Sequence, residues 1–170
     1  MRARLFLGDR RGAAAAEMAL VAPLLITLLF GSAELGNYFL NEHAVVKAVR
    51  DGARYASRLP MTDYPSCTPT SAAETQIRNV TRTGTIAGAT AGNRLSYWED
   101  TMGGSPTVTV VAACDTSGTY TGIYSGLAMG VPVVTVSATV PYRSLFGFFG
   151  LFNNTTFNLR ASSQAAVMGI

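Results

Sequence analysis

The sequence is poor in the residue types that most often carry chemistry. It contains one histidine, two cysteines and one tryptophan, and only 14% of its 170 residues are Asp, Glu, Lys or Arg. The single histidine, His43, has no second ligand at metal-binding spacing, which argues against a metal site and against a His-based catalytic triad. The GxSxG, GxxxxGK and HExxH motifs are all missing from the sequence,. We therefore expect no enzyme activity, no cofactor and no metal.

Net positive charge is confined to the N-terminal end. The formal net charge is +3, and residues 1–12 account for it with four arginines against Asp9. Basic and acidic residues balance from residue 13 onward, so the sequence predicts no basic patch and no nucleic-acid partner. Positive charge before an apolar segment favours a cytoplasmic N-terminus.

An apolar stretch begins directly after these arginines. Residues 13–33 read AAAAEMALVAPLLITLLFGSA and contain one ionisable group, Glu17. At 1.5 Å per residue, about 21 helical residues cover the roughly 30 Å hydrocarbon core of a bilayer, and Pro23 predicts a kink in this membrane helix. Because a carboxylate in such a span costs about 2–4 kcal/mol near the centre and less near an end, Glu17 is predicted to be paired or functional.

The helical pattern continues beyond the apolar stretch. Across residues 34–59, apolar residues recur at three- and four-residue steps with charged residues between them, and Pro60 follows. The pattern predicts one helix that runs to Arg58 and ends before the proline. Its apolar stripe is expected to cover a sheet that follows. The small residues at four-residue spacing on this face leave a partner helix in an assembly as the alternative: Ala48, Gly52 and Ala56.

The remaining residues, 60–170, predict one small domain. Ser71 followed by Glu74 has the spacing of a capping box and predicts a short helix over 72–83,. Alternation of apolar and polar residues predicts three strands, and the short connections favour antiparallel pairing. The strands are expected over 107–114, 134–140 and 157–167. The predicted fold class is α+β, with a long N-terminal helix packed on a small, mainly antiparallel sheet.

Two further features of this domain predict structure or contacts. Cys67 and Cys114 lack CxxC spacing and lie in what would be the exported part of the chain, so a structural disulfide is predicted. Closing its loop would stabilise the fold by about 4 kcal/mol in the chain-entropy model. Residues 144–152, SLFGFFGLF, form an apolar connection that we interpret as a possible contact loop. Its apolar members are Leu145, Phe146, Phe148, Phe149, Leu151 and Phe152.

The N-terminal residues carry a family resemblance. Gly12, followed by four alanines and Glu17, resembles the processing site of type IV prepilins. The segments 17–36, 49–57 and 140–167 are similar to TadE-like pseudopilins of the tight-adherence (Tad or Flp) pilus system. The resemblance implies that a prepilin peptidase cuts between Gly12 and Ala13. It also implies that Glu17, then fifth in the mature chain, acts as the assembly carboxylate by pairing with an N-terminal amine.

The same resemblance implies a role and a place in the cell. Flp major pilins are shorter and usually carry Glu-Tyr where this chain has Glu17 and Met18, so the chain resembles a minor pilin or pseudopilin, and TadF-like pseudopilins are of comparable size. The implied function is assembly of a Tad pilus used in surface adhesion. The implied partners are the prepilin peptidase, other Tad pseudopilins, the Flp major pilin, the Tad inner-membrane assembly platform and membrane lipid.

The expected organisation has four parts: a leader at 1–12, a transmembrane segment at 13–33, a periplasmic extension of the same helix at 34–59 and a periplasmic domain at 60–170. The chain would be a single-pass protein of the bacterial inner membrane, with its N-terminus in the cytoplasm and possible incorporation in the pilus. Two alternatives stay open. One is an unprocessed bitopic periplasmic adhesin or sensor with a ligand-binding C-terminal domain. The other is a secreted soluble protein cut after Ala33, since residues 18–33 also fit a signal peptide.

Overall fold

The computed structural model describes residues 10–88, 92–95, 98, 106–147 and 157–169. Two helices, α1 (Arg10–Arg58) and α2 (Ser71–Thr83), precede three strands, β1 (Thr107–Asp115), β2 (Val131–Pro141) and β3 (Asn158–Ala166). Short 3-10 turns complete the described elements: η1 (Met61–Asp63), η2 (Pro65–Cys67) and η4 (Gly122–Tyr124). The predicted α+β class, with its long N-terminal helix, is confirmed.

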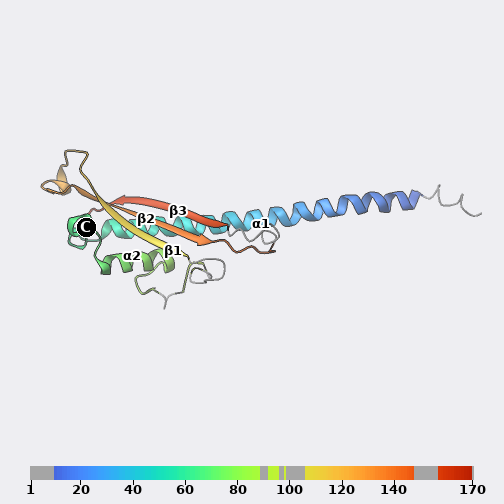
Figure 1. Cartoon of the computed structure of the whole chain (residues 1–170), viewed down its shortest axis with the longest axis horizontal. Coiled ribbons are helices and arrows are strands. Elements are labelled where there is room, and N and C mark those ends of the chain that lie inside the picture. The colour runs from blue at the N-terminus through green and yellow to red at the C-terminus, as the bar shows by residue number, and fades with distance from the viewer. Residues whose placement is uncertain (1–9, 89–91, 96–97, 99–105, 148–156, 170) are drawn as a thin grey trace, which may run out of the picture.

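Helix α1 is much longer than the domain that it supports. Its C-terminal half runs along the sheet, with α2 beside it, while its N-terminal half projects alone (Figure 1). The helix is continuous across Pro23, and Thr27 Oγ1 donates a hydrogen bond of 2.8 Å to the Pro23 carbonyl oxygen. The kink predicted at Pro23 remains a prediction. At the other end α1 stops at Arg58, two residues before the proline that cannot continue it.

The three strands form one antiparallel sheet in the order β1-β2-β3. Along β2, buried residues alternate with half-buried ones, so one face of the sheet packs on the helices. The buried members of this alternation include Val134, Val136, Ala138 and Val140. Hydroxyl and amide groups occupy the other face, where Ser137 and Ser162 share a hydrogen bond of 3.0 Å across the strands. The predicted antiparallel arrangement is confirmed, and its polar face is typical of a sheet that is solvated on one side.

The small residues of α1 pack against other elements of the same chain. Ala48, Gly52 and Ala56 are buried, and α1 packs on both the sheet and α2. A Cβ atom added at Gly52 would lie 2.1 Å from Thr81 Oγ1 of α2 and 3.5 Å from Val136 Cγ1 of β2. The amphipathic stripe therefore covers the sheet as predicted. The close helix approach that we considered for an assembly partner occurs with α2.

Helix α2 begins with a different cap from the one predicted. Thr70, not Ser71, is the N-cap, and its side chain accepts a 3.3 Å hydrogen bond from the Ala73 backbone N–H. Glu74, which the capping box would have used, instead pairs with Arg78 one turn later. Both Thr70 and Ser71 carry a suitable hydroxyl, and Thr70 has the extended backbone (φ −62°, ψ 156°) that an N-cap adopts,.

Candidate functional site

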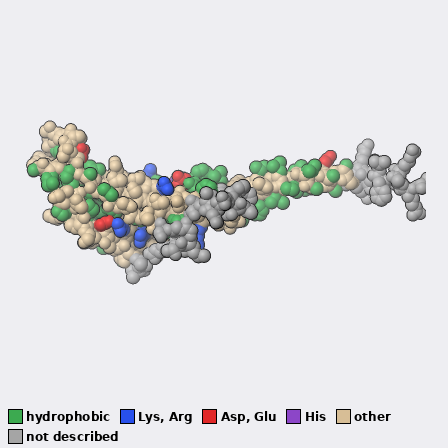
Figure 2. Space-filling model, in the orientation of Figure 1, with side chains coloured by type: hydrophobic (Ala, Val, Ile, Leu, Met, Phe, Trp, Pro, Cys, Tyr) green, Lys and Arg blue, Asp and Glu red, His purple; other side chains and the backbone are tan. Residues whose placement is uncertain are grey.

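The first part of the candidate site is the projecting half of α1. Its apolar side chains are exposed, and Figure 2 shows them along the projecting helix. Helix α1 is long and apolar enough to cross a membrane, and its most apolar stretch is not buried by the domain. Gly12, Ala13 and Glu17 all lie exposed near the start of this segment. Among the described residues, Glu17 has no ion pair.

The second part lies where the domain begins to cover α1, and it centres on Glu34. This carboxylate is only 1% exposed. Its Oε1 accepts a 2.6 Å hydrogen bond from the Tyr142 hydroxyl, and its Oε2 accepts bonds from the backbone N–H groups of Leu145 (3.1 Å) and Phe146 (3.2 Å). Three donors from the turn after β2 thus converge on one acid of α1.

Tyr142 is itself fixed from several directions. Its backbone N–H donates to the Phe157 carbonyl oxygen at 2.7 Å, which joins the residue after β2 to the residue before β3. Asn37 Nδ2 of α1 donates to the Tyr142 hydroxyl at 2.8 Å. The ring of Tyr38 meets the Tyr142 ring edge to face, with centroids 5.2 Å apart. The hydroxyl that donates to Glu34 therefore has a defined position.

The surroundings of Glu34 keep its carboxylate ionised at neutral pH. Burial raises the pKa of Glu34, but hydrogen bonds from Tyr142, Ser144 and the backbone of the turn together lower it further, so the pKa lies below its ordinary value,. Sequence reasoning missed this residue. The available signal was that Glu34 is the only Asp, Glu, Lys or Arg between Glu17 and Glu42, although nothing local indicated its partners.

The first two apolar residues of the predicted contact loop lie at this junction. Leu145 and Phe146 are 60% and 49% exposed, and the Phe146 ring packs edge to face on Phe30 of α1, with centroids 4.9 Å apart. The turn is therefore attached to α1 beside the C-terminal part of its apolar segment. The other predicted members lie outside the described residues: Phe148, Phe149, Leu151 and Phe152.

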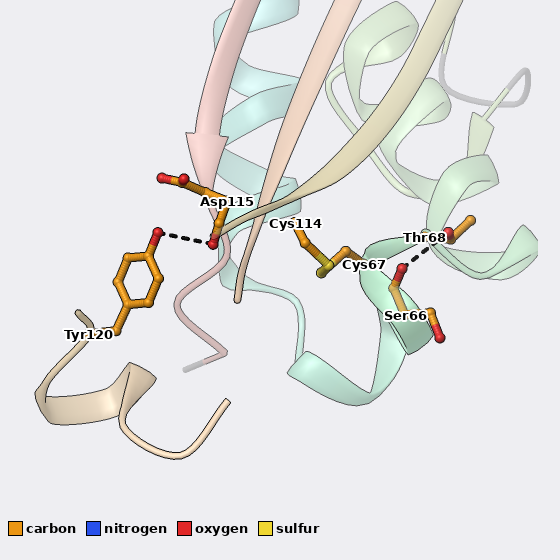
Figure 3. The surroundings of a disulfide bond; sticks show 6 residues. All are labelled: Ser66, Cys67, Thr68, Cys114, Asp115 and Tyr120. Carbon is orange, nitrogen blue, oxygen red and sulfur yellow. Dashed lines mark hydrogen bonds between the residues drawn. A yellow bond between two sulfur atoms is a disulfide. The ribbon is translucent and has the colours of Figure 1, made fainter. Parts of the chain in front are cut away.

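The two cysteines lie at the opposite end of the domain. Cys67 of η2 and Cys114 of β1 form a disulfide with Cα atoms 5.3 Å apart and 47 residues between them in sequence (Figure 3). Next to Cys114, the Asp115 carbonyl oxygen accepts a 2.9 Å hydrogen bond from the Tyr120 hydroxyl. The disulfide joins the segment after α1 to the sheet. This is a structural position, and it is far from the projecting helix (Figure 1).

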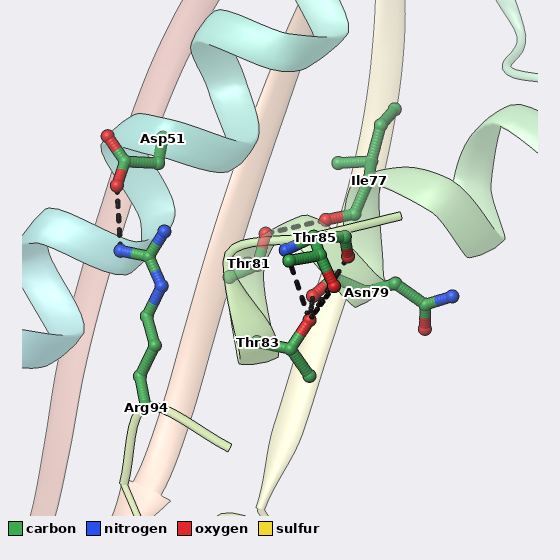
Figure 4. Close-up of polar contacts among 7 residues, drawn as sticks. All are labelled: Asp51, Ile77, Asn79, Thr81, Thr83, Thr85 and Arg94. Carbon is green, nitrogen blue, oxygen red and sulfur yellow. Dashed lines mark hydrogen bonds and ion pairs between the residues drawn. The ribbon is translucent and has the colours of Figure 1, made fainter. Parts of the chain in front are cut away.

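A partly buried ion pair attaches the segment that follows α2 to α1. Arg94 Nη1 lies 2.7 Å from Asp51 Oδ2 of α1 (Figure 4), and the Arg94 backbone N–H donates to the Arg82 carbonyl oxygen at 2.8 Å. Beside it, Thr83 Oγ1 bonds the Asn79 carbonyl oxygen at 2.8 Å and closes the last turn of α2. These contacts have a structural explanation and offer no reactive group.

The described residues hold no cluster of three or more His, Cys, Asp or Glu side chains that could bind a metal. His43 is exposed on α1. What the geometry provides instead is a long uncovered apolar helix and a hydrogen-bonded junction that attaches the domain to it. This arrangement defines an α+β protein with a long apolar N-terminal helix, which suggests a single-pass membrane protein.

A comparison with protein families agrees with this class. The family model described as "TadE-like protein" matches residues 12–54, which covers the projecting segment of α1 and most of its packed part. Over these residues the chain is similar to TadE-like proteins, as the resemblance implied. No curated protein and no solved structure matches the chain.

Proposed function

We propose that this protein is a minor pilin, or pseudopilin, that takes part in assembly of a Tad (Flp) pilus used in surface adhesion. One observation carries the proposal: the TadE-like match over residues 12–54 includes the apolar segment 13–33, whose side chains the domain leaves almost entirely exposed. A family signature and an exposed membrane-length surface thus coincide. The proposal treats the chain as a structural component and not as an enzyme.

Processing would take place between Gly12 and Ala13. In the part of the chain that the structure describes, no atom outside the local helix lies within 4 Å of the position of a Cβ at Gly12, so the described domain does not cover the bond. The arginines before it favour the cytoplasmic side, where the residues up to Gly12 would form the leader removed by a prepilin peptidase. Residues 13–33 would then span the inner membrane, and 34–59 and 60–170 would lie in the periplasm.

Glu17 would serve assembly after this cleavage. The new amino group at Ala13 lies four residues from Glu17, which is about one helical turn. A charge pair between the two, in one chain or between neighbouring subunits, would offset the cost of placing both charges in lipid or in a filament core. The exposed position of Glu17, without an ion pair among the described residues, is consistent with a partner that processing or assembly supplies.

The partners follow from this place in the membrane. The peptidase would act first, and the Tad inner-membrane assembly platform, other Tad pseudopilins and the Flp major pilin would meet the processed chain afterwards. The projecting helix offers an apolar surface for lipid and for the helices of other subunits. The disulfide-closed domain would be carried on the periplasmic side.

N-terminal sequencing of the full chain, expressed together with its prepilin peptidase, tests the proposal. We expect the mature chain to begin at Ala13, and Gly12→Val to block the cut. Gly31→Val is the matched control, since Gly31 lies in the same helix with equally open space, and it should leave processing intact. A chain that begins at Met1 would indicate the unprocessed bitopic protein. A chain that begins at Glu34 would indicate the secreted one, and either result would contradict the pseudopilin assignment.

A further inference from the structure

We propose that the turn at Leu145 and Phe146, together with exposed apolar side chains of α1 on either side of Glu34, forms a collar that enters the interfacial region of the bilayer on the domain side. The collar would hold the domain directly against the membrane surface. This inference rests on the proposed membrane anchoring and adds a second lipid contact, made by the domain itself.

The collar consists of large apolar side chains that the fold leaves uncovered. Their exposed fractions range from 40% to 71%. Its members are Phe30, Leu35, Phe39, Leu40, Leu145 and Phe146. Large apolar side chains are more often buried, so a cluster of exposed ones along about three turns of a helix and the adjacent turn indicates a contact surface.

Burial of Glu34 makes this surface compatible with lipid. Glu34 is the only Asp, Glu, Lys or Arg between residues 18 and 41, and it would place a charge in the middle of the collar if it were exposed. Instead it is 1% exposed, and Tyr142, Leu145 and Phe146 donate hydrogen bonds to it. The surface of α1 from Met18 to Leu40 therefore presents no charged side chain.

The length of the proposed membrane span places the collar at the membrane boundary. With residues 13–33 across the hydrocarbon core of about 30 Å, Phe30 lies about 5 Å inside the domain-side boundary and Leu40 lies about 10 Å beyond it, at 1.5 Å per residue. The collar therefore crosses the interface, where aromatic and leucine side chains of peripheral segments insert. The contact between the Phe30 and Phe146 rings, with centroids 4.9 Å apart, fixes the turn at the same depth.

The distribution of the collar around the helix favours lipid over one partner protein. Phe39 follows Phe30 by nine residues, which corresponds to two and a half turns of an α-helix and puts the two rings on opposite sides. A groove on a single partner would contact one side only, whereas a bilayer surrounds the helix on all sides.

Fluorescence quenching by lipids that are brominated at defined depths tests the inference on the full chain in phosphatidylcholine–phosphatidylglycerol vesicles. The native protein has one tryptophan, Trp98, which is fully buried in the domain and provides a constant background. Phe146→Trp probes the collar, and Leu145→Trp is a second probe of the same turn. Leu24→Trp reports insertion of the helix, and Ile123→Trp, 66% exposed in η4, reports a part of the domain expected to stay in water.

We expect shallow bromines to quench Phe146→Trp at least about twofold more strongly than Ile123→Trp, and deep bromines to quench Leu24→Trp. If Leu24→Trp is quenched while both turn probes behave like Ile123→Trp, the collar is wrong and the membrane anchor stands. If Leu24→Trp is not quenched, the anchor and the collar are both wrong. If an added partner protein abolishes quenching of the turn probes, the surface binds protein in preference to lipid, and the lipid assignment is also wrong.

Discussion

Replacement of Gly52 by alanine should destabilise the domain even though alanine is the better helix former. Gly52 lies at the crossing of α1 and α2, and its added Cβ would be 2.1 Å from Thr81 Oγ1. That hydroxyl cannot move freely, because Thr81 is fully buried and donates a 2.8 Å hydrogen bond to the Ile77 carbonyl oxygen. Either the helices separate or the hydroxyl loses its bond.

The expected size of the effect follows from three contributions. Overpacking of a tight core costs about 1–3 kcal/mol, and a hydroxyl that loses its hydrogen bond while buried costs about 1 kcal/mol more. The gain in helix propensity from glycine to alanine offsets about 1 kcal/mol. We therefore expect Gly52→Ala to lower the free energy of unfolding by about 1–3 kcal/mol.

A double-mutant cycle separates the clash from other effects. Thr81→Ala removes the obstructing hydroxyl, after which the nearest part of residue 81 to the added methyl is Cβ, at 3.3 Å. Gly52→Ala should then be nearly neutral, with a coupling free energy of about 1–3 kcal/mol. Denaturant unfolding of the full chain in detergent micelles, followed by fluorescence of the buried Trp98, measures each variant. Gly36→Ala is the control, because no described atom outside its own helix lies within 4 Å of that position.

The reasoning would be refuted if Gly52→Ala left stability unchanged or raised it, or if its effect were the same with and without Thr81→Ala. Either outcome would mean that α1 and α2 are not packed closely enough at this crossing to require glycine. Destabilisation by Gly36→Ala of the same size would point instead to a general sensitivity of α1.

Three further predictions concern the cysteines and the two acids of α1. Mass spectrometry of exported, non-reduced protein should find Cys67 and Cys114 oxidised together, and replacing both with serine should cost about 3–4 kcal/mol; free thiols would contradict this. Because the pKa of Glu34 is lowered, its stabilising contribution is complete above the ordinary carboxyl value of 4.5 and is lost as pH falls through the lowered value,. Glu34→Gln should thus reduce the loss of stability in acid, measured by unfolding at pH 7 and pH 3, and an unchanged acid loss would show that Glu34 is not its source. Glu17→Ala should leave processing and insertion intact and abolish pili or incorporation, so normal piliation would exclude charge pairing at Glu17.

Much of the fold could be predicted because its signals are local. The end of α1 before Pro60 depends on one residue that cannot extend a helix, and the strands depend on side-chain alternation that a half-buried sheet requires. The cap of α2 shows where such signals become ambiguous. Thr70 and Ser71 offer the same hydroxyl one residue apart, and the backbone conformation that decides between them is set by the preceding turn.

The junction at Glu34 could not be predicted in the same way. Its hydrogen-bond donor Tyr142 lies 108 residues away in sequence, and the donor groups of Leu145 and Phe146 belong to the backbone, which carries no sequence signal. Gly52 is an intermediate case. Its spacing from Ala48 and Ala56 predicted a close approach, but only the path of the chain after Pro60 determines that α2, and not another subunit, makes that approach.

Glu17 and Glu34 are two acids on one apolar helix, and the fold treats them differently. Glu34 is buried with three donors from its own domain, so folding alone satisfies its charge. Glu17 is exposed and has no ion pair among the described residues, so its cost in lipid remains unless another group meets it. Any partner that offsets the charge of Glu17 must therefore come from a later step, such as processing or assembly. This difference supports our proposal that Glu17, and not Glu34, is the carboxylate that acts in assembly.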